Sequence, residues 1–391
     1  MERDVFAVYD ERGLQLGERN DNMTKNTVAV IFGTRPEAIK LAPVAQALAT
    51  DSRLTPLLIN TGQHDSLMPT IMEWFGVTID QRLSLLVSGQ PLGILGGKLL
   101  HRLTEVLADE RPAMVIVQGD TLSAQMGALA AFYQQIPVAH VEAGLRTYNR
   151  LSPYPEEVAR RMVSIVAALH FAPTDSAADN LRHEGVEGQI VVTGNPVVDA
   201  LQYIRQITGG RNSPHPSERF RIVATIHRRE NHAYLADIFG ALVDLARRPG
   251  VDVILPLHAN PAVTQAAQTI FRDSPVQVIA PMDYVPWIQF LTTADLLISD
   301  SGGIQEEAPV LGIPLLVTRD VTERPEVLQT GHAVLVGHNR RTIVEAADHV
   351  ITGRHRFSAT QSPFGDGHAA ARIAGAVATW LESVHSLSVP S

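Results

Sequence analysis

Residues 27–49 read TVAVIFGTRPEAIKLAPVAQALA and contain the unit from which the rest of the chain is built. Thr27 is followed by five apolar residues, and four of these six residues are β-branched, which predicts a buried strand over residues 27–32. Gly33 then permits a tight turn, Thr34 suits a helix cap, and Pro36 suits the first position of a helix over residues 36–49. A buried strand that turns into a helix is typical of parallel α/β sheets.

The same alternation continues on both sides of a linker. Residues 208–219 read TGGRNSPHPSER, which is rich in Gly, Pro and Ser and predicts a linker. Strands are expected at residues 27–32, 54–60, 113–118, 137–141 and 189–193, and then at 220–225, 251–257, 276–280, 296–299 and 314–317. Helices are expected at 36–49, 92–108, 122–133, 155–169 and 176–183, and then at 235–246, 261–271, 285–293 and 341–351. The predicted fold is α/β, with two Rossmann-like domains that face a cleft.

The pattern divides the chain into five parts. We expect a flexible N-terminal tail over residues 1–22, a Rossmann-like domain over 23–207, a linker over 208–219, a second Rossmann-like domain over 220–365, and a C-terminal helix over 366–391 that packs back on the first domain. The tail carries recurring charges and no apolar h-region, so we do not expect a secretory signal. The expected location is therefore the cytoplasm.

Composition excludes several classes of function. The chain has 391 residues, with 41 acidic and 32 basic side chains and a net charge of −9, which argues against a nucleic-acid or anionic-membrane binder. It has no cysteine, so disulfides, thiolate metal sites and cysteine nucleophiles are excluded. It contains no HExxH spacing, no GxGxxG fingerprint and no GxxxxGK[ST] loop. We therefore expect no metal, no nicotinamide cofactor, no P-loop chemistry and no membrane span.

Two predicted turns could hold phosphate, because ligands of such sheets bind outside the carboxyl ends of the strands. Arg35 lies beside the positive end of the first helix and Lys40 follows one turn later, although a solvated arginine and lysine would fit equally well. Ser301, Gly302 and Gly303 follow the strand at 296–299, and the two glycines would let a phosphate approach free backbone N–H groups.

The helix after this second turn carries two acids, Glu306 and Glu307. One of them could accept hydrogen bonds from a ribose diol, as an acidic residue does in dinucleotide-binding folds. The alternative is an ordinary capped helix with acids near its start.

Acidic residues follow strands of the first domain. Asp120 follows the strand at 113–118, Glu142 follows the strand at 137–141, and Glu156 stands at a predicted helix start. Each one alone fits a solvated acid or a helix-dipole partner. Three on one wall of a cleft favour proton-transfer chemistry, because crowded carboxylates differ in proton affinity.

A basic cluster ends the first strand of the second domain. His227 is followed by Arg228 and Arg229, which favours a pyrophosphate site or an acid–base histidine over a surface basic turn. His258 follows the strand at 251–257 and is a weaker case of the same kind.

Nine motifs occur in a fixed order along the chain and cover nearly all of it, from about residue 28 to residue 365. They are FGTRPEAIKLAP (32–43), TGQH (61–64), GDT (119–121), HVEAGLRT (140–147), YPEEVAR (154–160), TGNPVVDAL (193–201), HRREN (227–231), DSGGIQEEAP (300–309) and TERPE (322–326). In these motifs the chain resembles the non-hydrolysing UDP-N-acetylglucosamine 2-epimerases. The resemblance implies a two-domain glycosyltransferase-B fold, a homodimer, a UDP-sugar substrate, and a reaction without metal or redox cofactor.

In such a reaction UDP leaves by elimination across the first two sugar carbons, giving 2-acetamidoglucal, and adds back while a proton enters carbon 2 from the opposite face. By resemblance, Asp120, Glu142 and Glu156 are the catalytic carboxylates and His227 is the histidine that stabilises the leaving phosphate. Asp120 and Glu142 are assigned to proton transfer, with the face that each serves left open, and Glu156 supports that transfer or orients the intermediate.

The resemblance also implies the substrate contacts. Arg35, Lys40, Ser301, Gly302, Gly303 and Arg324 match phosphate and nucleotide contacts, Glu307 matches the ribose contact, and residues 281–287, with Met282 and Trp287, match the stretch at uracil. Gln63, Arg228 and His258 retain part of a second, activator site. Asp65 stands there where many members have a cation, which should weaken capture of a second diphosphate. We therefore expect weak or absent activation by substrate.

Three other functions fit the same residues. A hydrolysing epimerase would release UDP and N-acetylmannosamine, and a glycosyltransferase of the same fold would exchange no proton at carbon 2. A non-catalytic nucleotide-sugar sensor would bind without turnover, although the presence of all three acids argues against it.

Overall fold

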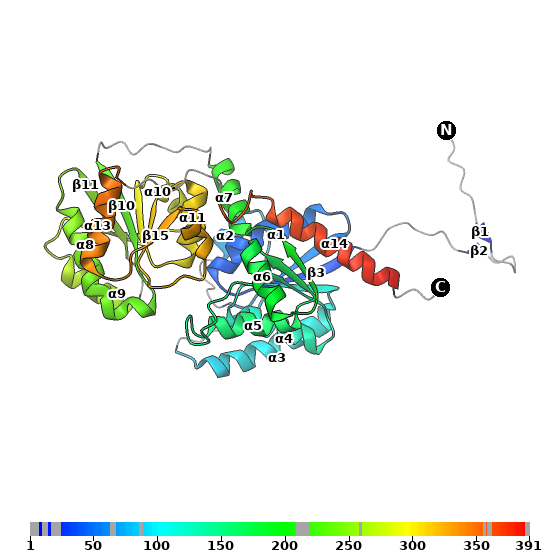
Figure 1. The fold of residues 1–391 in the computed structure, drawn as a ribbon. Coiled ribbons are helices and arrows are strands. Elements are labelled where there is room, and N and C mark those ends of the chain that lie inside the picture. The colour runs from blue at the N-terminus through cyan, green and yellow to red at the C-terminus, as the bar shows by residue number, and fades with distance from the viewer. Residues whose placement is uncertain are drawn as a thin grey trace, which may run out of the picture.

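The computed structural model describes residues 8–9, 15–16, 25–62, 68–85, 89–208, 219–257, 260–354, 357 and 362–387. It contains two parallel sheets, each flanked by helices, which confirms the predicted fold class (Figure 1). Within the range expected to be a tail, β1 (Val8–Tyr9) and β2 (Gln15–Leu16) form a separate two-stranded antiparallel sheet.

The first sheet has seven strands, and every neighbouring pair is parallel. Its residues alternate between two buried faces: Val28, Val30 and Phe32 point to one core, and Ala29 and Ile31 point to the other. The strands, in spatial order, are β5 (Gln81–Arg82), β4 (Leu54–Asn60), β3 (Asn26–Phe32), β6 (Met114–Gln118), β7 (Val138–Val141), β8 (Leu169–Ala172) and β9 (Gln189–Val192).

Helices cover both faces of this sheet (Figure 1). One group consists of the mutually packed helices α1 (Arg35–Thr50), α7 (Pro196–Ile207) and α14 (Ala369–Leu387). The other consists of α3 (Leu92–Glu110), α4 (Leu122–Tyr133) and α5 (Glu156–Val166), in which α4 contacts both neighbours. The first domain is completed by α2 (Met68–Trp74) and α6 (Asp175–Glu184).

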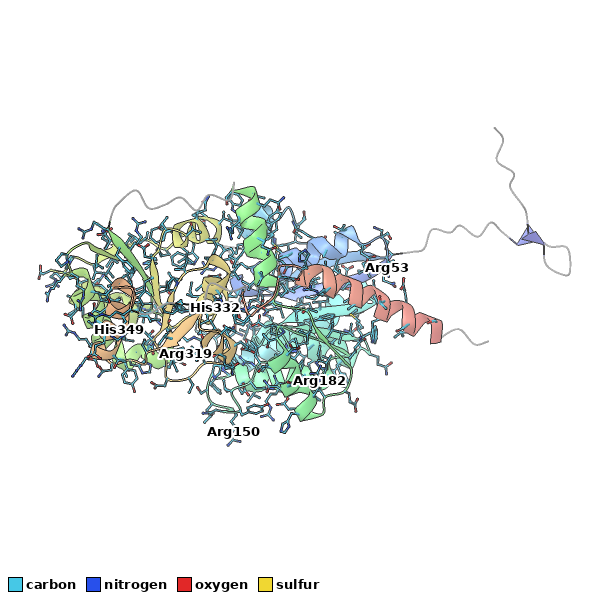
Figure 2. The ribbon with its side chains drawn as sticks, turned by 45° about the horizontal axis from the view of Figure 1, so that its top comes forward. Arg53, Arg150, Arg182, Arg319, His332 and His349 are labelled. Atoms are coloured by element: carbon cyan, nitrogen blue, oxygen red, sulfur yellow. The ribbon has the colours of Figure 1, made fainter. Side chains whose placement is uncertain are left out.

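The last helix, α14, belongs to the first domain although it follows the second in the chain. Ile373, Val377 and Leu381 are buried in the core shared with α1 and α7. Asp199 accepts hydrogen bonds from the first two backbone amides of the helix, at 3.2 and 2.9 Å. Figure 2 shows Arg53 beside α14, where it pairs with Glu382 at 3.2 Å.

The second sheet has six parallel strands. In spatial order they are β12 (Gln277–Ile279), β11 (Val251–Pro256), β10 (Phe220–Thr225), β13 (Leu296–Ser299), β14 (Leu315–Val317) and β15 (Ala333–Leu335). One face carries α8 (Leu235–Ala246), α9 (Pro261–Ile270) and α13 (Arg340–Ile351). The other face carries α10 (Tyr284–Leu291) and α11 (Gly302–Leu311), which contact α7 of the first domain. The short helices η1 (Arg229–Tyr234) and α12 (Pro325–Gln329) lie in connections.

One predicted boundary is wrong. The helix expected at residues 155–169 ends at Val166, because Ala167 has an extended backbone with φ −78° and ψ 134°. The chain then enters β8, a strand that the sequence pattern did not predict. The run from Val163 to Ala172 is almost continuously apolar, so its periodicity could not separate the end of a buried helix from the start of a buried strand.

The strand order places the ligand-binding edge of each sheet. The order reverses between β3 and β6 in the first sheet and between β10 and β13 in the second. Ligands of doubly wound sheets bind at such reversals, outside the carboxyl ends of the strands. Within the described ranges, no helix is both long and apolar enough to cross a membrane.

Candidate functional site

The first wall of the site follows β6 and β7. Asp120 comes after Gly119, whose φ of +69° turns the chain at the end of β6. His140 Nε2 lies 2.8 Å from the Gly119 carbonyl oxygen, and burial lowers the pKa of His140 to about 3, so its ring is neutral and donates to that carbonyl. Asp120 is therefore presented by a backbone turn that the interior of the domain fixes.

Glu142 follows β7 and has a φ of +62°, a left-handed conformation that is uncommon for a residue other than glycine. Its carboxylate accepts a hydrogen bond from Gln118 Nε2 at 2.7 Å and forms an ion pair with Lys40. Such a backbone costs on the order of 1 kcal/mol or more and is typical of functional sites.

Glu142 belongs to a buried ion cluster that joins the domains. We call Lys40, Glu142, Glu306 and Arg324 the cleft ion cluster. Lys40 Nζ lies 2.8 Å from Glu306 Oε2, and Arg324 Nη2 lies 2.5 Å from Glu306 Oε1 and 3.4 Å from Glu142 Oε1. All four side chains are buried, two come from each domain, and the cluster contains two cations and two carboxylates.

Burial and charge act differently on the members of the cleft ion cluster. Burial alone would lower the pKa of Lys40, but Glu142 and Glu306 raise it. Burial would raise the pKa of Glu306, but Arg324 and Lys40 lower it. Burial and then the charge of Glu306 raise the pKa of Glu142, in spite of Lys40 and Arg324. Glu142 is thus the member best placed to exchange a proton.

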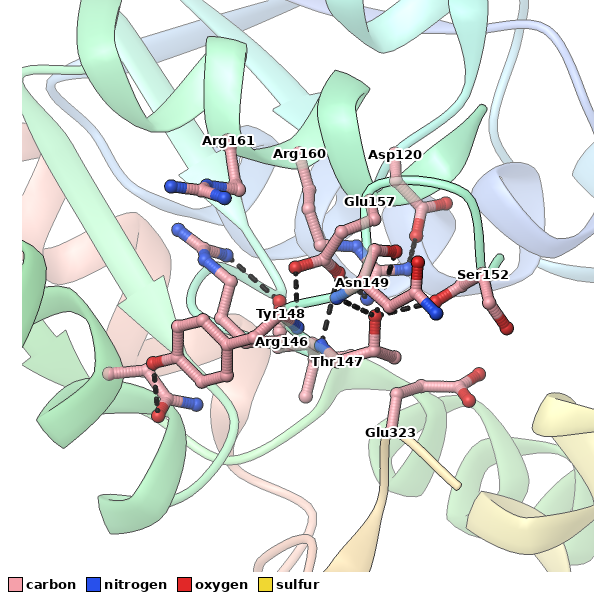
Figure 3. A network of polar contacts seen from close by, with 12 residues as sticks. Asp120, Arg146, Thr147, Tyr148, Asn149, Ser152, Glu157, Arg160, Arg161 and Glu323 are labelled. Atoms are coloured by element: carbon pink, nitrogen blue, oxygen red, sulfur yellow. Dashed lines mark hydrogen bonds and ion pairs between the residues drawn. The ribbon is translucent and has the colours of Figure 1, made fainter. Parts of the chain in front are cut away.

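Asp120 is held by a second network, drawn in Figure 3. Arg160 on α5 forms an ion pair with Asp120 and lies 3.5 Å from Glu157 Oε2. The Glu157 carboxylate accepts hydrogen bonds from the backbone amides of Thr147 and Tyr148, at 3.1 and 3.0 Å. The start of α5 therefore fixes both the orientation of Asp120 and the loop that precedes the helix.

Glu156 stands at the first position of α5, next to this network. Its Oε2 is buried and has no hydrogen-bond partner in the part of the chain that the structure describes. Burial and then the charge of Asp120 raise the pKa of Glu156, while Arg228 of the second domain acts in the opposite direction. The carboxyl of Glu156 therefore binds a proton more readily than a solvated glutamate does, and it is close enough to both Asp120 and Arg228 to be affected by their charges.

The second wall begins at the end of β10. The backbone amides of His227 and Arg228 donate to Asp300 Oδ2 at 3.0 and 2.9 Å, and Asn231 Nδ2 donates to the same oxygen at 2.9 Å. His227 Nδ1 lies 3.4 Å from Asp300 Oδ1. The buried Asp300, at the end of β13, thus anchors the turn that carries the histidine.

Two guanidinium groups lie over the start of α11. A Cβ added at Gly302 would lie 2.9 Å from Arg324 Nη1 and 3.1 Å from Arg228 Nη2, so only glycine fits there without displacing them. Glu323 pairs with Arg324 Nη1 at 2.5 Å and with Arg319 at 2.9 Å. Figure 2 shows Arg319 in the second domain. Cationic side chains above the positive end of a helix are an arrangement suited to binding an anion.

The remaining predicted substrate contacts lie around α10. Tyr284 OH donates to Glu307 Oε1 at 3.1 Å, and burial raises the pKa of Glu307 to about 7. Arg35 and Tyr284 line a narrow pocket between the domains together with Trp74 and Phe75. Trp287 lies on α10, half-buried against the core, with its ring centroid 6.1 Å from that of Phe290.

Met282 is half-buried and precedes α10. Of the predicted activator residues, Arg228 Nη2 lies 3.6 Å from Glu323 Oε1. Gln63, Asp65 and His258 lie outside the described residues. Among the residues that the structure describes, no group of three or more His, Asp and Glu could hold a metal ion.

Several residues of the site did not stand out in the sequence. Arg160 is four positions after Glu156, which places both on one face of α5, and this spacing could have identified it. Glu323 and Asp300 lie within the TERPE and DSGGIQEEAP motifs. Their main hydrogen-bond and ion-pair partners include residues distant in sequence, so no local pattern identifies those partners.

Comparison with known proteins shows which family the chain resembles. A model of the family described as UDP-N-acetylglucosamine 2-epimerase matches residues 46–378. The UDP-N-acetylglucosamine 2-epimerase of Yersinia pestis is 40% identical over 365 residues, which cover 88% of this chain and 96% of that protein. The crystal structure of the UDP-GlcNAc 2-epimerase from Neisseria meningitidis, bound to UDP-GlcNAc, has a TM-score of 0.85 at 37% identity and covers 90% of this chain and 100% of that one.

A more distant structure bears on the fold alone. The spinosyn rhamnosyltransferase has a TM-score of 0.52 at 15% identity and covers 92% of this chain and 96% of that one. The two-domain arrangement is that of the glycosyltransferase-B fold. Since both the family model and the relatives span most of the chain, the protein belongs to the UDP-N-acetylglucosamine 2-epimerase family.

Proposed function

We propose that the protein interconverts UDP-N-acetylglucosamine and UDP-N-acetylmannosamine without releasing the free sugar. One observation carries this proposal: Asp120, Glu142 and Glu156 lie on one wall of the site, and the start of α11, with Arg228 and Arg324 over it, belongs to the other. A proton must be exchanged on both faces of the sugar while a diphosphate is held in place, and these two walls supply both functions.

The proposed reaction has two balanced halves. A carboxylate removes the proton at carbon 2, the C–H electron pair forms the double bond to carbon 1, and UDP leaves with the electron pair of the C1–O bond. The intermediate is 2-acetamidoglucal. UDP then attacks carbon 1, and a carboxyl on the opposite face delivers a proton to carbon 2. The enzyme regains its starting protonation state through solvent.

We assign Asp120 and Glu142 to these proton transfers. Asp120 forms an ion pair with Arg160, whereas Glu142 lies in the cleft ion cluster, where burial and the charge of Glu306 raise its pKa. Glu156 supports the transfer through its buried, unpartnered oxygen. His227, held by Asp300, stabilises the leaving phosphate.

The second wall is proposed to bind UDP. The diphosphate would be bound by Arg35, Lys40, Ser301, Gly302, Gly303 and Arg324. Glu307 rather than Glu306 would accept from the ribose diol, because Glu306 is enclosed in the cleft ion cluster whereas Glu307 has a neutral partner in Tyr284. Met282 and Trp287 would border uracil.

Incubation with UDP-GlcNAc in deuterated water, followed by NMR, tests the proposed reaction. We expect both nucleotide sugars to persist and to acquire deuterium at carbon 2. Accumulation of free N-acetylmannosamine would instead establish hydrolysis, and turnover without deuterium would favour glycosyl transfer. Binding of UDP-GlcNAc without any turnover would indicate a non-catalytic nucleotide-sugar sensor.

Asp65 stands where many family members have a cation in the activator site, and this replacement is the basis for a proposal about activation by substrate. We propose that substrate activation is weak, so initial rates from UDP-N-acetylmannosamine should rise hyperbolically with concentration. A strongly sigmoidal rate curve that a trace of UDP-GlcNAc abolishes would contradict this proposal.

We also propose that the protein is a homodimer through the outer face of α4 and α5. Val158, Met162 and Ile165 form an apolar stripe at helical spacing on α5, and Ile165 is 75% exposed. Phe132 and Tyr133 at the end of α4 are also exposed. Contiguous exposed apolar surface of this kind marks an interaction site.

A further inference from the structure

We propose that Glu306 is a positioning residue for Glu142: it holds Lys40 of the first domain and Arg324 of the second at the catalytic carboxylate. The inference rests on the proposed role of Glu142 in proton transfer. It assigns to Glu306 a function that is separate from nucleotide binding, although its neighbour Glu307 is proposed to bind the ribose.

The contacts of Glu306 support a positioning role. Its side chain is 1% exposed, and each of its oxygens faces a different cation. Oε2 lies 2.8 Å from Lys40 Nζ, while Oε1 lies 2.7 Å from Arg324 Nε and 2.5 Å from Arg324 Nη2. The same two cations contact Glu142, so the two carboxylates share both partners.

Because Glu306 and Glu142 share the cations Lys40 and Arg324, the charge of Glu306 affects the proton affinity of Glu142. In the described part of the chain, the charged groups that act most strongly on Glu142 are Lys40 from α1, Glu306 from α11 and Arg324 from the turn before α12. Gln118 from β6 adds a neutral amide, and Glu323 lies on the far side of Arg324. If Glu306 lost its charge, its repulsion of the Glu142 carboxylate would disappear, and Lys40 would keep Glu142 as its carboxylate partner in the cluster while Arg324 would share Glu142 with Glu323. Both changes would lower the pKa of Glu142.

The arrangement also links Glu142 to the relative position of the domains. Lys40 and Gln118 belong to the same domain as Glu142, whereas Glu306 and Arg324 belong to the other. When the domains separate, Glu142 loses Arg324 and, of its partners among the described residues, keeps Lys40 and Gln118. The proton-transfer group therefore has its working environment only when α11, which would also bind the diphosphate, lies against the first domain.

The test is the pH dependence of kcat for epimerisation in the full-length protein. Glu306→Gln should lower kcat about tenfold or more without raising KM, because an uncharged side chain leaves the cations more available to the diphosphate. The limb of the pH profile that belongs to Glu142 should move to lower pH by about one unit. Glu306→Asp keeps the charge and should give a smaller displacement in the same direction.

Glu326→Gln is the matched control. Glu326 is also a buried carboxylate between the domains, where it accepts a hydrogen bond from Thr174 Oγ1 at 2.6 Å. Among the residues that the structure describes, it forms no hydrogen bond or ion pair with the cleft ion cluster. This variant can lower the thermal midpoint, but it should leave both limbs of the pH profile in place. A loss of kcat without a shifted limb in Glu306→Gln would indicate a merely structural role and overturn the inference.

Two further outcomes keep the test decisive. Removing one member of a buried ion pair can prevent folding, and if Glu306→Gln does not fold, Glu306→Asp decides: a wild-type kcat and wild-type limbs overturn the inference. Glu142→Gln separates this inference from the proposed function. If that variant keeps near-normal turnover, the role of Glu142 fails; if it is inactive while Glu306→Gln resembles the wild type, only the role of Glu306 fails.

Discussion

Asp120 and Glu142 are both acidic residues but have different surroundings: Asp120 lies beside Arg160, and Glu142 lies inside the cleft ion cluster. Asp120→Asn and Glu142→Gln should each lower kcat about 100-fold or more with a smaller change in KM, because each removes a proton-transfer group. Steady-state kinetics measure both parameters. Glu105→Gln, which neutralises an exposed carboxylate on α3, is the matched control. Near-normal turnover in both active-site variants would refute the assignment.

Glu307 gives a pH-dependent prediction. Its pKa is raised to about 7 in the folded protein from an ordinary value of 4.5, so the folded state retains the proton longer than the unfolded state. This group therefore reduces stability progressively as the pH rises from about 4.5 to about 7, by on the order of 3 kcal/mol when fully ionised. Glu307→Gln should raise the thermal midpoint of the ligand-free protein at pH 8 and much less at pH 5. Equal effects at both pH values would contradict this account.

At the scale of one element, the two arginines can lie over the start of α11 because Gly302 has no side chain. Gly302→Ala should raise KM for UDP-GlcNAc about tenfold, equivalent to about 1.4 kcal/mol, because the methyl group would displace Arg324 and Arg228. Gly303→Ala keeps the backbone amide, and its Cβ would meet only Ser301 Oγ at 3.7 Å, so a smaller rise is expected. Equal KM values for the two variants would show that the arginines do not set the affinity.

The elements themselves were largely predictable from the sequence. Strands such as β3 and β10 have clear turn signals at their ends, and their observed bounds differ from the predicted ones by at most a residue. The break between α5 and β8 was not predictable, because both segments are buried and apolar. The candidate acids were visible at the strand ends, and the spacing from Glu156 places Arg160 on the same face of α5. The ion pairs of Arg160 with Asp120 and of Glu306 with Lys40 were not predictable, since these partners come from distant parts of the chain.

At the scale of the whole molecule, the apolar stripe on α5 predicts the oligomeric state. Ile165→Glu should convert the proposed dimer into a monomer, because it places a charge in the middle of that face. Light scattering coupled to gel filtration measures the mass. Val278→Glu, on the exposed side of β12, makes the same change on the other domain and should leave the mass unaltered. A wild-type protein that is already monomeric would end the proposal.

The path of α14 has a consequence for the integrity of the protein. The chain passes from the first domain to the second after α7 and returns before α14, so the C-terminal half ends inside the fold of the N-terminal half. Cleavage at a protease site engineered between residues 209 and 218 should therefore yield two fragments that remain non-covalently associated. We expect the nicked protein to elute as one species and to retain activity, as a split enzyme does when its pieces complement each other. If the fragments separate under native conditions, the packing of α14 on the first domain is too weak to hold them together once the linker is cut.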